Sequence, residues 1–477
     1  MKKLIFSILT LSAIFTSCNT ELDINTNPDQ LGENSAPLSA QLPAGIVGIV
    51  GPQGAGMAIF GGFWSQYWTQ SNAANQFKDI DNYSAGTADY NFIWDSMYDG
   101  LGDIRNVKRN ALAQGNWKYY LIATTLEVQA SQILTDMYGS IPYEEANVKA
   151  IQAPHFNTGE EVYDLMIQDL NDALSRDLDA SIGETPGTDD LIFGGNMAQW
   201  TRFANTLKLK VYMRQTNSSR AAIANAGISQ MIADGTQFLT VDAAMTQFTD
   251  AINQSNPLYE YVIRRLNVST NLRMSTTLSS YLDSHADTRK AKYYNAGNSL
   301  DQGDFLNPVG AGTIATVKLS ATTPVLLLSR EESLFLQAEA MERYNGGTGA
   351  KALYDAAVTA NFARHSLSAA SYLTGDYEYD TTGSLEDKLE QIITQKWAAS
   401  FPGNGFEAFF EKNRTGYPRT SDVPQSDAGY IDGQFAYAVN GVTAGLFPKR
   451  IVYPLSERNP NPNAPALELI TTPIWWE

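Results

Sequence analysis

The chain has 477 residues, a formal net charge of −18 and one cysteine, and 18% of its residues are charged. A body this acidic repels the phosphates of nucleic acids and of anionic lipid headgroups, so no nucleic-acid partner is expected. The lone cysteine excludes an intramolecular disulfide, and the length exceeds that of one ordinary domain.

The first residues, MKKLIFSILTLSAIFTSC, have the pattern of a secretory signal. Lysines precede an apolar run that ends in small residues, and this run is shorter than the roughly 20 residues that span a bilayer. We expect residues 1–17 to be a signal peptide and Cys18 to be the lipid-attachment residue of a lipoprotein; the alternative is a buried structural cysteine. Residues 18–37 are expected to form a lipid tether and entry segment, followed by the body at 38–477.

Residues 38–68 are apolar and rich in glycine, and prolines interrupt them at Pro43 and Pro52. This composition predicts buried, closely packed helices rather than a membrane span. The glycines at 51–56 are not followed by Gly-Lys-Ser/Thr, so they do not form a phosphate-binding loop.

Apolar residues recur at helical spacing from about Asp89 onward, which predicts a helical body. Thr158 and Glu161 have the spacing of a capping box, as do Ser329 and Glu332. The expected helices cover residues 117–138, 158–174, 196–215, 219–234, 329–344, 350–366, 385–401 and 406–412. They come in pairs at close to the roughly 34-residue spacing of tetratricopeptide repeats. Residues 236–321 and 415–477 are expected to be irregular excursions with short strands, and such segments often carry a binding surface.

Motifs of known chemistry are missing from the sequence. His155, His285 and His365 lack ligand spacing, and HExxH, CxxC and Gly-x-Ser-x-Gly do not occur. We therefore expect no metal, no cofactor and no catalysis. Residues 79–83 (DIDNY) begin like a calcium loop but lack its glycine, and they are interpreted as a solvated turn. Nothing in the sequence selects a carboxylate pair for glycoside hydrolysis among its 51 acidic residues.

Residues 64–90 hold the densest mixture of aromatic and amide side chains. Sugar rings dock on flat aromatic faces while their hydroxyls bind amides and charges, so this segment is the predicted ligand site, with a second contribution from the 236–321 excursion. The predicted ligand-binding residues are Trp68, Gln70, Asn72, Asn75, Phe77, Tyr83, Arg273 and Tyr294. We expect Phe77 and Tyr83 to be exposed. Trp64 and Trp68 are four residues apart, so the alternative for them is that both lie on one buried face of a helix and do not contact ligand.

Seven segments, in order along the chain, resemble the SusD/RagB family of outer-membrane nutrient-binding lipoproteins. Besides the leader, they are residues 134–143 (LTDMYGSIPY), 200–209 (WTRFANTLKL), 331–344 (EESLFLQAEAMERY), 395–397 (QKW), 413–418 (NRTGYP) and 449–459 (KRIVYPLSERN). Their residues also suit the fold, because Trp200 and Leu207 are core candidates and Arg414 and Arg450 can each pair with a carboxylate.

The resemblance implies an all-α-dominated, SusD-like superhelix of four tetratricopeptide-like pairs, with large irregular insertions that carry short strands. It also implies a lipid-anchored protein on the outside of the outer membrane. Such a protein captures an oligosaccharide and passes it, as a lid, to a SusC-like TonB-dependent barrel. Three alternatives remain: a peptide-binding lid of the RagB type, a surface glycoside hydrolase, and a scaffold that binds only protein.

Overall fold

The computed structural model describes residues 36–308 and 310–477, so the expected leader and Cys18 lie outside the described residues. Helices dominate the described part of the chain. The α-helices are α2 (Leu38–Pro52), α3 (Ala58–Trp64), α4 (Lys78–Asp81), α5 (Asn91–Gln114), α6 (Trp117–Tyr138), α7 (Gly159–Ser175), α8 (Met197–Arg214), α9 (Ala221–Ala233), α10 (Pro257–Tyr259), α11 (Thr276–Ser284), α12 (Lys290–Tyr293), α13 (Arg330–Tyr344), α14 (Ala350–Arg364), α15 (Leu385–Ala399), α16 (Gly405–Thr415) and α17 (Leu455–Arg458). The strands and the 3-10 or π turns are β1 (Trp68–Thr69), β2 (Ala243–Met245), β3 (Arg273–Met274), β4 (Val325–Leu328), η1 (Gln53–Met57), η2 (Leu178–Ala180), η3 (Glu260–Arg265) and η4 (Ala311–Thr313).

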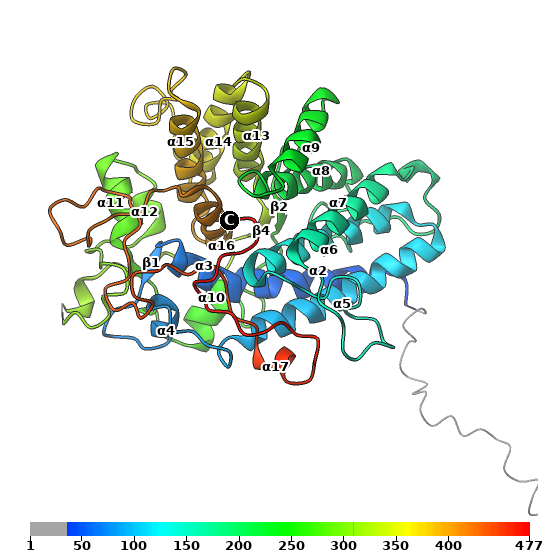
Figure 1. Ribbon diagram of the computed structural model, residues 1–477, viewed down its shortest axis with the longest axis horizontal. Coiled ribbons are helices and arrows are strands. Elements are labelled where there is room, and N and C mark those ends of the chain that lie inside the picture. Colours follow the sequence, from blue (N-terminus) through cyan, green and yellow to red (C-terminus); the bar gives the residue numbers. More distant parts are fainter. Residues whose placement is uncertain (1–35, 309) are drawn as a thin grey trace, which may run out of the picture. The chain divides into compact units, whose positions relative to one another are not determined.

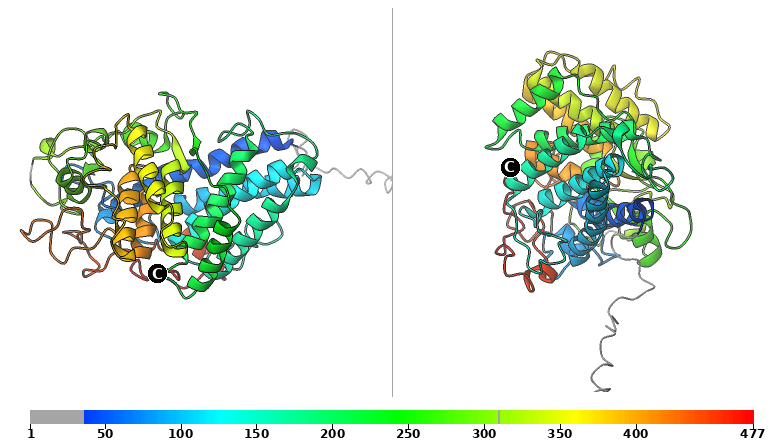
Figure 2. Two further views of the ribbon diagram at one scale, coloured as in Figure 1. Left: turned by 90° about the horizontal axis from the view of Figure 1, so that it is seen from above. Right: turned by 90° about the vertical axis from the view of Figure 1, so that its right-hand side faces the viewer.

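Helices that follow each other in the sequence pack together as pairs (Figure 1), as α5 does with α6, α8 with α9, and α13 with α14. The view from above in Figure 2 shows α13 and α14 beside α15 and α16. The predicted helices are confirmed to within a few residues at their ends. The capping box of α7 is present in full: Thr158 Oγ1 accepts from Glu161 N, and the Glu161 carboxylate accepts from Thr158 N.

The apolar glycine-rich segment is a continuous run of α2, η1 and α3 inside the protein. It is long and apolar enough to cross a membrane, but 72% of its most apolar window is buried and α2 packs along α5. The expectation of closely packed buried helices is confirmed. It also packs closely on α16, where a Cβ on Gly61 would lie 1.9 Å from the backbone nitrogen of Phe406. Only glycine allows the two backbones to approach this closely.

Each of the two sheets has two antiparallel strands. β1 pairs with β3 in the register Trp68↔Met274 and Thr69↔Arg273, and β2 pairs with β4. These pairings tie the 236–321 excursion back to the N-terminal helices and to the start of α13. Within the described residues, the second excursion contains the short helix α17 but no named strand. Both excursions are therefore largely irregular as expected, but the short strands expected in 415–477 are not found there.

One continuous hydrophobic core extends from Leu38 to Trp476, and a smaller one lies between α8, α9 and α13. Trp476 is fully buried, and its indole N–H donates to the Asp136 carboxylate over 2.9 Å. The C-terminal segment therefore completes the core around α6.

Candidate ligand-binding surface

Most of the predicted ligand-binding residues lie inside the protein. Asn72 and Asn75 are exposed. The others have side chains that are at most 4% exposed, and they are Trp68, Gln70, Phe77, Tyr83, Arg273 and Tyr294. The expectation that Phe77 and Tyr83 are exposed is wrong. Their rings offer no free face on which a sugar could stack.

Trp68 is buried because α3 ends at Trp64 and the chain then turns inward into β1. Its ring lies 6.3 Å from Phe63 and 6.2 Å from Phe401, both in edge-to-face geometry. Trp64 is also buried and packs on Phe409 at 5.0 Å. Both tryptophans are therefore core residues, although Trp68 reaches the core from a strand and not from a helical stripe.

The buried polar residue predicted in this segment, Gln70, already forms internal hydrogen bonds. Gln70 Oε1 accepts from the backbone N–H of Phe77 over 3.1 Å, and Gln70 Nε2 donates to the carbonyl of Asn271 over 3.2 Å. The hydrogen bond between Gln70 and Phe77 N holds the Phe77 ring inside the protein, where its centroid lies 5.8 Å from that of Phe63. Tyr83 packs edge-on against Tyr437 at 5.6 Å. Gln70, Phe77 and Tyr83 therefore lie beneath the protein surface and cannot contact a ligand on it.

The structure does bring Arg273 and Tyr294 to the predicted segment. Arg273 lies opposite Thr69 in the β1–β3 pair, and its Nη1 donates to the carbonyl of Ile314 over 2.6 Å. The hydroxyl of Tyr294 donates to the carbonyl of Tyr67 over 2.7 Å. The expected proximity is correct, but both side chains are buried supports.

Asp81 organises this region, and the sequence did not indicate it. Residues 79–83 were expected to be a solvated turn, yet the Asp81 side chain is fully buried. Its carboxylate accepts from Thr69 Oγ1 (2.7 Å), Gln70 N (2.8 Å) and Gln302 Nε2 (2.6 Å). Because burial outweighs these donors, the pKa of Asp81 rises to about 7. We call Thr69, Gln70, Asp81 and Gln302 the Asp81 hub.

Above the hub, three loops meet and present exposed side chains. The 436–447 loop is held to the others because Val442 N donates to the Asn82 carbonyl over 3.0 Å and Asn440 Nδ2 donates to that of Gly303 over 2.8 Å. We define the loop surface as the exposed residues Asn72, Asn75, Leu306, Val439 and Val442. It combines amides with apolar side chains, as ligand sites for polar organic molecules do.

Phe92 is an exposed aromatic residue that the predicted segment missed by two positions. Its side chain is 38% exposed at the start of α5, and its ring lies 6.2 Å from that of Tyr261, at an angle of 24°. A partly exposed ring held by a second ring can stack on a sugar. The signal for its exposure in the sequence is weak, because phenylalanine is among the residues most often buried.

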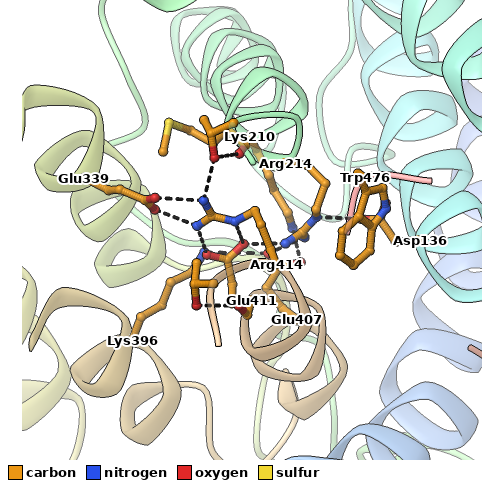
Figure 3. Close-up of polar contacts among 12 residues, drawn as sticks. Asp136, Lys210, Arg214, Glu339, Lys396, Glu407, Glu411, Arg414 and Trp476 are labelled. Atoms are coloured by element: carbon orange, nitrogen blue, oxygen red, sulfur yellow. Dashed lines mark hydrogen bonds and ion pairs between the residues drawn. The ribbon is translucent and has the colours of Figure 1, made fainter. Parts of the chain in front are cut away.

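A second group of buried polar residues links α6, α8, α13, α15 and α16 (Figure 3). Arg214 Nε lies 3.0 Å from Asp136 Oδ2 and its Nη2 lies 2.7 Å from Glu407 Oε1, while Arg414 Nη2 lies 2.7 Å from Glu339 Oε2. We call the group the ionic network, and its members are Asp136, Lys210, Arg214, Glu339, Lys396, Glu407, Glu411 and Arg414. Several come from the segments that resemble the family, so those segments serve the fold.

Burial raises the pKa of Asp136 to about 6, but its two carboxylate oxygens already accept from Arg214 and Trp476. Glu407 does not have the electrostatics of a glycosidase general acid. Burial alone would raise the pKa of Glu407, but Arg214, Lys210 and Lys396 outweigh it and lower the pKa to about 2. A general acid for glycoside hydrolysis needs a raised pKa. Among the described residues, no group of three or more His, Cys, Asp or Glu is arranged to hold a metal ion.

The chain belongs to the SusD-like family, described as starch-binding and associating with the outer membrane, whose model matches residues 57–438. This is a family of nutrient-binding outer-membrane proteins whose members are generally not enzymes. No match to a curated protein was found.

Solved structures show the same fold. A SusD homologue from Bacteroides uniformis is 24% identical with a TM-score of 0.74, and the match covers 92% of this chain and 99% of that one. A SusD homologue from Bacteroides vulgatus is 22% identical with a TM-score of 0.72 over 92% and 97% of the two chains. A chitin-binding SusD homologue from Flavobacterium johnsoniae is 22% identical with a TM-score of 0.71 over 91% and 98%. The predicted SusD-like, helix-dominated fold is therefore confirmed.

Proposed function

We propose that this protein is a non-catalytic, surface-exposed lipoprotein that captures an oligosaccharide and delivers it, as a lid, to a SusC-like TonB-dependent barrel. The observation that carries the proposal is the family match over residues 57–438. In this proposal residues 1–17 are removed as a signal peptide, Cys18 carries the lipid, residues 18–37 form the tether and residues 38–477 form the body.

The loop surface is the proposed contact for the ligand. Asn72 and Asn75 present amides to solvent, and Leu306, Val439 and Val442 are exposed apolar side chains on the other two loops. The Asp81 hub fixes the loops from below, so the surface is formed before the ligand arrives. A chitin-binding homologue with this fold supports a glycan ligand. Phe92 is proposed as the stacking ring in place of Phe77 and Tyr83.

Binding of defined ligands to the purified mature body tests the proposal. Isothermal titration would compare chito-oligosaccharides, malto-oligosaccharides and mixed peptides. We expect an oligosaccharide to bind, and we expect the double variant Asn72→Ala/Asn75→Ala, and separately Phe92→Ala, to weaken binding several-fold. Asn225→Ala, which removes an exposed amide on α9, is the matched control.

Each alternative has its own outcome in the same experiment. Binding of peptides but not glycans would indicate a lid of the RagB type, and release of reducing sugar would indicate a hydrolase. A confirmed glycan that binds every loop-surface variant as tightly as the parent would move the site elsewhere.

The anchor and the barrel are tested in cells. Cys18→Ala should remove labelled palmitate from the protein, and the parent should co-purify with a large outer-membrane protein in mild detergent. Labelling of the variant would exclude Cys18 as the attachment residue. Recovery of the parent alone from the native membrane would contradict the partnership.

A further inference from the structure

A cavity of about 370 Å³ lies between the helices, away from the loop surface residues. Its walls are the first turns of α13, the end of α14, the end of α15 with the turn that follows, and the segment 318–326. We call it the interhelical cavity, and its residues used below are Glu332, Phe335, His365, Lys396, Phe401 and Gly403. Its volume lies in the range of about 300–1,000 Å³ that small-molecule sites occupy.

Three polar atoms on these lining residues have no hydrogen-bond partner. They are Lys396 Nζ, Glu332 Oε1 and His365 Nε2, and each is shielded from solvent. Lys396 is 2% exposed, and its closest carboxylates, Glu407 and Glu411, both lie 3.6 Å away, outside hydrogen-bonding distance. Glu332 Oε1 lies 3.1 Å from Lys210 Nζ but without hydrogen-bond geometry. Leaving such groups unbonded is costly, so a bound molecule that bonds to them is favoured.

The chemistry of the three groups narrows the kind of molecule. The ammonium of Lys396 only donates. Burial raises the pKa of Glu332, while Lys210 beside it acts in the opposite direction, and the free oxygen of its carboxyl accepts. Burial lowers the pKa of His365 to about 4, so its imidazole is neutral at pH 7.

A charged ligand fits this set poorly. A ligand carboxylate near Lys396 would also lie near the acidic side chains of the ionic network, and a ligand cation would meet the ammonium of Lys396. A hydroxyl both donates and accepts, so a neutral molecule with several hydroxyls suits a lining that holds both donors and acceptors. The rings of Phe335 and Phe401 offer apolar contact to its C–H faces.

We propose that the interhelical cavity binds a small, neutral, polyhydroxylated molecule of monosaccharide size. This second site does not depend on the loop surface, and it would hold its ligand within the helical body.

Gly403 allows the cavity to be blocked without disturbing the fold. A Cβ added at Gly403 meets no atom within 4 Å, and the residue does not have a left-handed backbone conformation. Gly403→Leu should therefore fill part of the cavity. Gly51→Leu is the matched control, because Gly51 has equally open space on α2 and does not line the cavity. Equal melting temperatures would show that both variants fold.

The test uses the mature body with D-glucose, D-galactose, N-acetylglucosamine, D-xylose and myo-inositol as probes, and sodium acetate as the anionic comparison. We expect at least one neutral probe to bind, with electron density against Lys396 and Glu332 in a soaked crystal. Gly403→Leu should weaken this binding about tenfold or more, while Gly51→Leu and Asn72→Ala/Asn75→Ala leave it unchanged.

Three results would overturn the proposal. They are a cavity that holds only water at saturating probe concentration, acetate that binds there in preference to every neutral probe, and a Gly403→Leu variant that binds as tightly as the parent. Loss of binding in Asn72→Ala/Asn75→Ala but not in Gly403→Leu would assign the probe to the loop surface instead. The two proposals therefore fail separately.

Discussion

The ionic network and the Asp81 hub bury carboxylates in different ways. In the ionic network, cationic side chains surround Glu407 and hold its pKa near 2 although burial acts in the opposite direction. In the Asp81 hub, the donors to Asp81 are neutral hydroxyl and amide groups, and burial raises its pKa to about 7. Glu407 therefore keeps its charge over the physiological pH range, whereas Asp81 changes its protonation near neutrality.

Removing Arg214 should have the largest effect, because it contacts three buried carboxylates at once. Arg214→Met leaves Asp136, Glu407 and Glu411 without this partner, and we expect a loss of about 3–5 kcal/mol in the free energy of unfolding. Urea unfolding followed by circular dichroism measures it. Arg419→Met is the control, because Arg419 pairs with Glu390 at the surface, where solvent screens the pair, and its loss should be far smaller. Similar losses in the two variants would contradict the comparison.

Breaking the Asp81 hub should lower the free energy of unfolding by less than Arg214→Met does, because it removes a neutral donor and not a cation that pairs with buried carboxylates. Gln302→Ala removes the donor to Asp81 Oδ1, and we expect a loss of about 1–3 kcal/mol in the free energy of unfolding. Gln247→Ala, which removes one exposed amide contact to Leu191, should change stability by less than about 0.5 kcal/mol. A hub variant as stable as this control would show that the hub does not fix the loops.

The dependence on pH separates the two regions further. The pKa of Asp81 in the folded state, about 7, exceeds its ordinary value of 3.8, so the folded state binds the proton more tightly than the unfolded state. The stability that this group contributes is full below about pH 3.8 and is lost as pH rises through 7. Relative to Asp81→Asn, the parent should lose up to about 1.4 kcal/mol per pH unit between pH 5 and 7.

Asp387→Asn provides the reference for that experiment. Asp387 is exposed, and hydrogen bonds from Ser384 lower its pKa, so it stays ionised in both states above pH 5. The difference between the parent and this variant should remain flat from pH 5 to 8. A flat difference for Asp81→Asn as well would mean that Asp81 is ionised in the fold at neutral pH.

The smallest change in stability is expected at the loop surface itself. The double variant Asn72→Ala/Asn75→Ala removes two exposed amides. The hydrogen bond that is lost with them, from Lys78 Nζ to Asn75 Oδ1 over 2.6 Å, is itself exposed to solvent. We expect the free energy of unfolding to change by less than about 0.5 kcal/mol. A loss above about 1 kcal/mol in thermal unfolding would show that these amides belong to the support beneath them.

The helical body could be predicted because its signals are local. Helical periodicity is read within a single helix, and the Thr158–Glu161 capping box spans one helical turn. The seven ordered segments identified the family for a related reason, since they contain residues such as Trp200 and Arg414 that are buried and bonded within the fold.

The candidate site could not be predicted in the same way, because burial there depends on non-local pairing. Trp68 is buried by β3, and Asp81 by Gln302, which is 221 residues away in the sequence. A mixture of aromatics and amides has the same composition whether its rings face solvent or the core. The proximity of Arg273 was anticipated, but its orientation depends on the Ile314 carbonyl that it binds.

The contact between Trp476 and Asp136 has a consequence for the order of assembly. These residues are 340 positions apart, and Asp136 also binds Arg214 on α8. A chain that emerges from its N-terminus carries α6 and α8 long before α16 and Trp476 are available to complete their surroundings. Closing contacts across such separations slows folding. Native packing around α6 is therefore expected to form in a late, cooperative step that joins the C-terminal segment to α6 and α8.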